Sequence, residues 1–343
     1  MTSLKPGLKT GPSLVVPAAF AATGYTTHFT DALAGLPEGF PEALDEPMTW
    51  TGAQFTQPSD YVYTLSNSDL QETENALWYF KALGLDGDLI SRDNFPLPKL
   101  GLQLNKICRD VHHGKGFGLI RGLDVQKYST EDMTLLYLGI QSYIANRHGR
   151  QDRKGNMLVH IVADNSSKLK AGHHRHSTTS IKPVILSVGS REVLPRPNLC
   201  HRPVLFQVEG RVMINFSRVA LIGNAVHPRP SNLPRLSLRQ IEALDAIDSI
   251  ARAACLEINT QAGDIHFVNN LTILHRREGF VNGETPQERR HLVRMRLRDD
   301  DLGWRLPQEL RQEWADAFDG TRPKIWHLEP MPDGFFPLRS NAN

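Results

Sequence analysis

The chain is poor in cysteine, in long apolar runs and in charge of one sign. Its 343 residues include only three cysteines, Cys108, Cys200 and Cys255, and their wide spacing excludes a disulfide framework or a cysteine-built zinc site. This scarcity favours a reducing, cytoplasmic location. No apolar run reaches the roughly 20 residues of a membrane span, so we expect no membrane contact. Because 39 Lys and Arg stand against 37 Asp and Glu, we expect no nucleic-acid partner either.

The length permits one large domain or two small ones, at roughly 100–200 residues per domain. Residues 1–57 carry several prolines and glycines and little periodicity, so we expect an irregular leader there. The apolar stretch 14–22 follows two lysines but is short and broken by Pro17, and it imitates a signal peptide only weakly. We expect a single domain over 58–320 and a C-terminal tail over 321–343.

Helical patterns come first along the chain and strand patterns follow. We predict helices at 68–83, 102–111, 130–145, 236–258 and 306–318, and strands at 117–120, 157–162, 204–208, 211–216, 264–268, 271–275 and 291–297. Ser237 and Gln240 form a capping box for the long fourth helix. This order favours an antiparallel β core with helices packed outside it.

One informative stretch runs from 263 to 277. Its first strand is expected to end in a tight turn at Asn269 and Asn270, and the chain would return as a second strand. Leu271, Ile273 and His275 would then share one face, by the period of two. A histidine at the end of such a face is either a core group with satisfied hydrogen bonds or a metal ligand.

A second informative stretch, 289–298, is rich in arginine. Arg290, Arg294, Arg296 and Arg298 alternate with apolar residues and fall on one strand face. One interpretation is a solvated edge strand. The other is that one arginine points inward and binds a carboxylate with two parallel hydrogen bonds, as a planar guanidinium can.

Residues 263–298 resemble the C-terminal signature of fungal members of the taurine dioxygenase family. These proteins are Fe(II)/2-oxoglutarate-dependent oxygenases of the clavaminate-synthase-like superfamily. The resemblance extends, in order, over 95–104, 116–124, 137–149, 155–161, 215–218 and 233–254. It covers the chain from about 45 to 318.

The resemblance implies a mainly β fold, a double-stranded β-helix (jelly roll) flanked by helices. The family binds iron through a His-x-Asp/Glu pair and a distant second histidine, which His275 matches by position. Arg294 matches the arginine that binds the far carboxylate of 2-oxoglutarate, and Arg290 matches its frequent helper. The implied activity is hydroxylation or desaturation of a small-molecule substrate, and fungal relatives often act in secondary metabolism. Taurine itself is not implied.

The chain departs from this pattern at the first metal motif. The only His-x-acid sequence is His327-Leu328-Glu329, in the tail, and only 25 residues, 177–201, separate His176 from Arg202. We therefore predict an internally shortened jelly roll. His174 and His176 could join His275 in an all-imidazole site, or they belong to a solvated basic loop.

Two functions follow from this incomplete set of ligands. The first is an Fe(II)/2-oxoglutarate-dependent oxidoreductase. The second is a catalytically inactive jelly-roll protein with a binding or accessory role. Since one imidazole cannot hold Fe(II) against water, we predict weak Fe(II) binding by this chain.

Overall fold

The computed structural model describes residues 40–41, 43–162, 186–188, 203–223, 228–231, 233–276 and 291–329. The chain divides into two compact units, Met1–Ala43 and Leu44–Asn343, and the second unit contains every helix and strand named below. Across the ranges that the structure describes, none of the helices combines the length and the apolar character needed to span a membrane. The predicted boundaries at 57 and 320 stay predictions.

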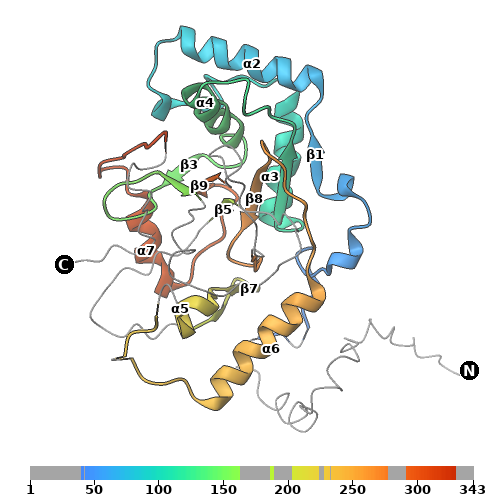
Figure 1. The fold of residues 1–343 in the computed structure, drawn as a ribbon, viewed down its shortest axis with the longest axis vertical. Coiled ribbons are helices and arrows are strands. Elements are labelled where there is room, and N and C mark those ends of the chain that lie inside the picture. Colours follow the sequence, from blue (N-terminus) through green and yellow to red (C-terminus); the bar gives the residue numbers. More distant parts are fainter. Residues whose placement is uncertain are drawn as a thin grey trace, which may run out of the picture. The chain divides into compact units, whose positions relative to one another are not determined.

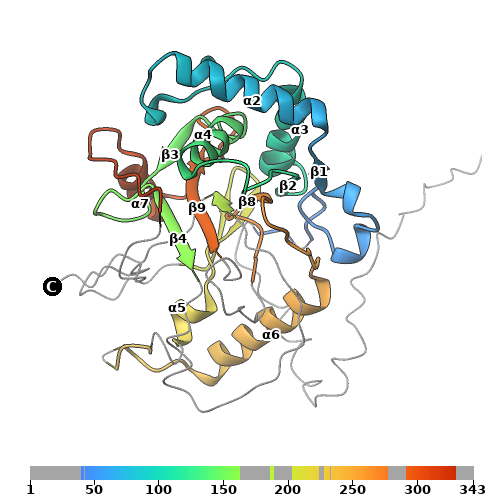
Figure 2. The ribbon, with the colours of Figure 1, turned by 45° about the horizontal axis from the view of Figure 1, so that its top comes forward.

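The first three α-helices of this unit are α2 (Asn67–Ala82), α3 (Leu100–His113) and α4 (Thr130–Gln141). Figures 1 and 2 show them close together, with α2 against α4 and α3 against the sheet. Ser66 caps α2 and Ser129 caps α4, each by accepting a backbone N–H three residues on. All three predicted helices are confirmed, although α4 ends at Gln141 rather than at 145.

These helices supply about half of the residues in the largest buried cluster. Leu100, Leu104 and Val111 are fully buried along one side of α3, and Phe80 of α2 joins the same cluster. Each such side chain stabilises the fold by roughly 1.5–3 kcal/mol relative to an exposed one. The cluster also includes Phe267 and Met295 from the sheets, so the helices hold these strands in place.

The strands form three sheets. The first has the order β1-β2-β8-β5, the second β3-β9-β4, and the third is the hairpin β6-β7. Their bounds are β1 Val62–Thr64, β2 Phe117–Arg121, β3 Arg147–Gly149, β4 Leu158–Val162, β5 Leu186–Val188, β6 Leu205–Val208, β7 Arg211–Ile214, β8 Ile265–Asn269 and β9 His291–Arg298. β1 pairs with β2 and β5 with β8 in parallel, whereas the other pairs are antiparallel.

Two parts of the fold prediction need correction. The described core is not purely antiparallel, because β2 and β8 each have a parallel neighbour. It is not mainly β either, since the described strands span three to eight residues while α2, α3 and α4 span 12 to 16. A sheet-containing fold with flanking helices is what the structure shows, and the jelly roll stays a prediction.

The remaining elements follow local sequence signals. The hairpin turns at Glu209 and Gly210, both with positive φ (52° and 77°), as a two-residue turn between twisted strands requires. The capping box at Ser237 and Gln240 is confirmed, and it begins α6. The other bounds are α5 Arg218–Ile222, α6 Leu238–Ala254, α7 Gln308–Phe318 and the short 3-10 helices η3 Gly52–Gln54, η4 Pro58–Asp60 and η5 Gly87–Leu89.

The segment after α7 is tied to the start of β4. Met157 N donates to the Ile325 carbonyl at 2.9 Å, and Ile325 N donates to the Gly155 carbonyl at 2.8 Å. Gly155 has a φ of +101°, and a Cβ there would lie 2.6 Å from the Pro323 carbonyl oxygen. Only glycine therefore permits this close approach.

Candidate functional site

His275 lies six residues after the end of β8, in a segment without regular structure. The predicted returning strand at 271–275 is wrong. Thr272 N and Ile273 N both donate to the Asn269 carbonyl, and Leu271 N donates to Asn269 Oδ1. This Asx-type turn satisfies the backbone locally and removes the need for a strand partner.

The apolar residues of this segment do not share one face, in contrast to the prediction for a strand. Leu271 packs into a cluster with Phe206 and Trp304, whereas Ile273 packs into a different cluster with Phe117. The two side chains therefore reach separate parts of the core, and His275 follows them to the protein surface, where the residue is exposed.

Arg294 lies in the middle of β9, directly opposite Val159 of β4. β9 pairs with β4 over His291–Met295 and with β3 over Arg296–Arg298. Because Arg296 is buried, the interpretation of a strand whose arginine face is solvated is wrong. Met295, Arg296 and Leu297 are buried, so both faces of the strand are covered at these positions. Arg294 itself is half-buried.

His275 and Arg294 influence each other electrostatically. Partial desolvation of the His275 imidazole lowers its pKa. The positive charge of Arg294 lowers the pKa of His275 further. At neutral pH the imidazole is therefore neutral, which is the form that binds a metal ion.

The other predicted site residues cannot be placed beside this pair. Arg290, His174 and His176 lie outside the described residues. Within the described ranges there is no group of three or more His, Cys, Asp or Glu side chains that could hold a metal ion. The described part of the chain thus contributes one imidazole and one guanidinium to the candidate site.

The structure also contains a group of histidines that the sequence did not predict. His160 contacts both His291 and the backbone of His327. His160 Nε2 donates to the His327 carbonyl at 2.6 Å, so its Nδ1, 2.9 Å from His291 Nε2, accepts from that atom. Burial lowers the pKa of both His160 and His291. His327 Nε2 donates to Asn156 Oδ1 at 3.0 Å. The single His-x-acid sequence therefore joins the C-terminal segment to β4.

Comparison with known proteins identifies several that are similar to this chain. The model of the taurine catabolism dioxygenase TauD, TfdA family matches residues 188–296. The chain is 32% identical over 359 residues to the taurine hydroxylase-like protein SAT17 of Stachybotrys chartarum, which covers 89% of this chain and 91% of that protein. Crystal structures of the non-heme iron oxygenase OrfP, one of them in complex with Fe, are 14% identical in sequence, with TM-scores of 0.45 and 0.42. They cover 70% and 72% of this chain and 94% and 97% of their own.

Proposed function

Because the chain belongs to the taurine catabolism dioxygenase TauD/TfdA family, we propose that it is a taurine hydroxylase-like oxygenase that oxidises a small molecule. The proposed cosubstrate is 2-oxoglutarate, and the proposed metal is Fe(II). Fungal secondary metabolism is the proposed setting. The substrate is left at the level of a small molecule, since no described residue discriminates among substrate classes.

The observation that supports this proposal is the electrostatic effect of Arg294 on His275. The two residues come from different segments, one after β8 and one in β9, and the charge of Arg294 acts on the His275 imidazole. A guanidinium that is half-buried beside a neutral imidazole suits a dicarboxylate, because it can bind one carboxylate with two hydrogen bonds. Arg290, the proposed helper, would add a second positive charge.

The described side chains do not fit an iron site by themselves. A facial site needs about three protein donors, and among the described residues His275 belongs to no cluster of metal-ligating side chains. An iron site in this chain would need further donors from outside the described ranges, and His174 and His176 are the proposed ones. We propose weak Fe(II) binding on this basis.

The incomplete donor set also supports a second candidate function. A catalytically inactive member of the family would keep the carboxylate-binding arginine and act as a binding or accessory protein. Both candidates predict 2-oxoglutarate binding through Arg294, and only the first predicts its oxidation.

Titration calorimetry with 2-oxoglutarate tests the shared part of the two candidates. We expect Arg294→Ala to lose about 2–5 kcal/mol of binding free energy, because a buried charge pair is broken. Arg305→Ala is the matched control, since that arginine is exposed and pairs with Glu209 on the surface. Equal binding by wild type and Arg294→Ala would remove Arg294 from the site.

Anaerobic Fe(II) titration then separates the two candidates. Weak binding, with no succinate formed from 2-oxoglutarate under oxygen, supports the inactive protein. Tight binding that is lost in both His275→Ala and His176→Ala, together with succinate formation, supports the oxygenase and contradicts the weak-binding proposal. Tight binding that survives His275→Ala would place the metal elsewhere.

A further inference from the structure

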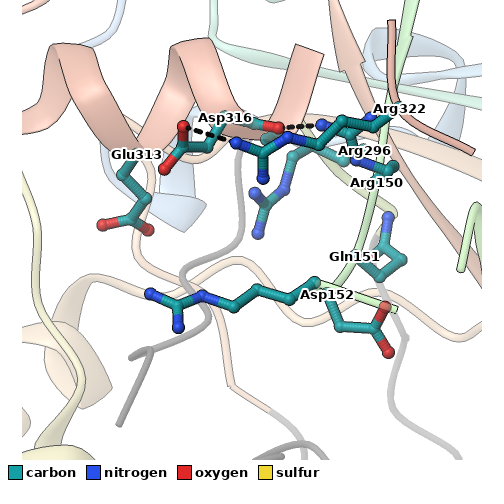
Figure 3. A pocket seen from close by; sticks show the side chains of 9 residues that line it. Arg150, Gln151, Asp152, Arg296, Glu313, Asp316 and Arg322 are labelled. Atoms are coloured by element: carbon teal, nitrogen blue, oxygen red, sulfur yellow. Dashed lines mark hydrogen bonds and ion pairs between the residues drawn. The ribbon is translucent and has the colours of Figure 1, made fainter. Parts of the chain in front are cut away.

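Two residues beyond Arg294 on β9, Arg296 helps to line a small cavity. The cavity lies between β9, the segment after β3, and the C-terminal end of α7 (Figure 3). Its principal lining residues are Arg150, Gln151, Arg153, Arg296, Asp316 and Arg322. The volume is about 30 Å³, compared with the roughly 10–15 Å³ that one water molecule requires, so only a small ligand fits.

Two of the four arginines are deeply buried. Arg150 is 4% exposed and Arg296 is 6% exposed. Arg150 donates from Nη1 to the Asp319 carbonyl at 2.7 Å and from Nη2 to the Asp316 carbonyl. Burial lowers the pKa of Arg150, as does the charge of Arg322, while the carboxylates of Asp319 and Asp316 act in the opposite direction.

The carboxylates that line the cavity, Asp152, Glu313 and Asp316, are fewer than its arginines. Asp152 is engaged with its own loop: its Oδ1 accepts from three successive backbone N–H groups and its Oδ2 from the Asn156 amide. Arg322 pairs with Asp316 at 3.6 Å, which a dashed line in Figure 3 marks, and with Asp319, outside the lining, at 3.2 Å. The lining itself holds four arginines and three carboxylates, and this balance favours an anion.

Gln151 is the observation that points to a ligand. It is 3% exposed, and neither its Oε1 nor its Nε2 has a hydrogen-bond partner among the residues that the structure describes. Buried amide atoms are costly to leave without partners. The Oε1 atom can only accept and the Nε2 group can only donate, so a ligand that satisfies both must carry a donor as well as an acceptor.

We propose that this cavity binds a small oxyanion that retains a proton, of the class of hydrogen phosphate and bicarbonate. The anionic oxygens accept hydrogen bonds from the surrounding guanidinium groups. The hydroxyl of the ligand donates to Gln151 Oε1, and one of its oxygens accepts from Gln151 Nε2. Sulfate has similar size and charge but no proton at neutral pH, so it leaves Oε1 unsatisfied.

Titration calorimetry on the full chain tests this site, with phosphate, bicarbonate and sulfate in separate titrations at neutral pH and constant ionic strength. We expect one phosphate or bicarbonate per chain and at least about tenfold weaker sulfate binding, the effect of one hydrogen bond to a charged group. The tighter of the first two anions identifies the ligand. Sulfate binding as tight as the better of these anions, or no binding of any anion, would overturn the proposal.

Two variants locate the site. Gln151→Met keeps the side-chain length but removes both polar atoms, so we expect the preference over sulfate to disappear. Arg322→Gln changes an exposed residue whose ion pairs with Asp316 and Asp319 lie near the surface, and we expect it to weaken the binding of each anion about two- to fivefold. Arg305→Gln is the control and should bind like the wild type. Unchanged binding in both Gln151→Met and Arg322→Gln would show that the anion binds elsewhere.

Discussion

Two helices of similar length, α3 and α6, contribute very differently to the core. Of the 14 residues of α3, seven are buried, whereas among the 17 residues of α6 only Leu244 is buried. Leu238 and Ile250 of α6 are 78% and 54% exposed. Since most helix stability in proteins comes from packing of an apolar face, α3 is part of the cooperative core and α6 is a peripheral element.

The two helices also differ in how their first turns are capped. α6 begins with its own capping box, so its start is encoded locally at Ser237. α3 has no side-chain cap of its own at Lys99. Instead Glu72 of α2 accepts hydrogen bonds from Lys99 N at 2.8 Å and Leu100 N at 3.0 Å. The well-packed helix is thus capped by a tertiary neighbour, and the poorly packed one by its sequence.

The largest expected effect comes from removing core volume in the two helices. Leu104→Ala in α3 should lower the free energy of unfolding by about 2–5 kcal/mol, because Leu104 is fully buried and its loss leaves a cavity. Leu244→Ala in α6 should cost less than half as much. Urea unfolding followed by circular dichroism measures both. Ile250→Ala is the exposed control and should stay within about 0.5 kcal/mol of the wild type.

An equal loss in Leu104→Ala and Leu244→Ala would contradict the comparison. It would show that α6 unfolds together with the main core.

The free energy of unfolding should also depend on pH, through the buried histidine His266. Burial of His266 in β8 lowers its pKa to about 4, although Asp264 beside it acts in the opposite direction. The unfolded chain has an ordinary histidine pKa near 6.5 and therefore binds the proton first. This contribution to stability is complete above about pH 6.5 and is lost as the pH falls toward 4, by about 3 kcal/mol in all.

His266→Gln should remove this part of the slope. Urea unfolding at about pH 7 and at about pH 4.5 measures the difference between the variant and the wild type. His113→Gln changes an exposed histidine at the end of α3, where desolvation and the charge of Arg211 also lower the pKa, and it should remove less of the wild-type slope than His266→Gln does. The same slope in wild type and His266→Gln would show that His266 is not buried in solution.

The sequence predicted the helices well because their signals are local. Ser66, Ser129 and Ser237 each stand at the start of a helix and cap it, and the cap at Ser237 was predicted. The strand at 271–275 was wrong for the opposite reason. Alternation of apolar residues also occurs where a chain reaches two separate clusters, and only the positions of Phe206 and Phe117 decide between these cases.

The candidate site was predictable only through resemblance to a family. His275 and Arg294 lie on different segments, and no spacing rule brings them together. The cavity lined by Arg150, Arg296 and Arg322 was not predicted, because Arg322 comes from a segment far along the chain from Arg150. Its one sequence signal was the Arg150-Gln151 pair, which alone resembles an ordinary solvated loop.

The smallest expected effects on stability come from removing the caps of α3 and α6. Glu72→Ala removes the acceptor of two backbone N–H groups at the start of α3, and it should lower the global free energy of unfolding by about 1–2 kcal/mol. Ser237→Ala weakens α6 by about 1 kcal/mol, but α6 can open locally without the core. The global free energy of unfolding of Ser237→Ala should therefore change by less than about 0.5 kcal/mol, while hydrogen exchange of the α6 amides becomes about fivefold faster.

Ser66→Ala, at the start of the well-packed α2, is the control and should lower the global free energy of unfolding. If Ser237→Ala lowers the global value as much as Ser66→Ala does, α6 belongs to the same cooperative unit as the other helices.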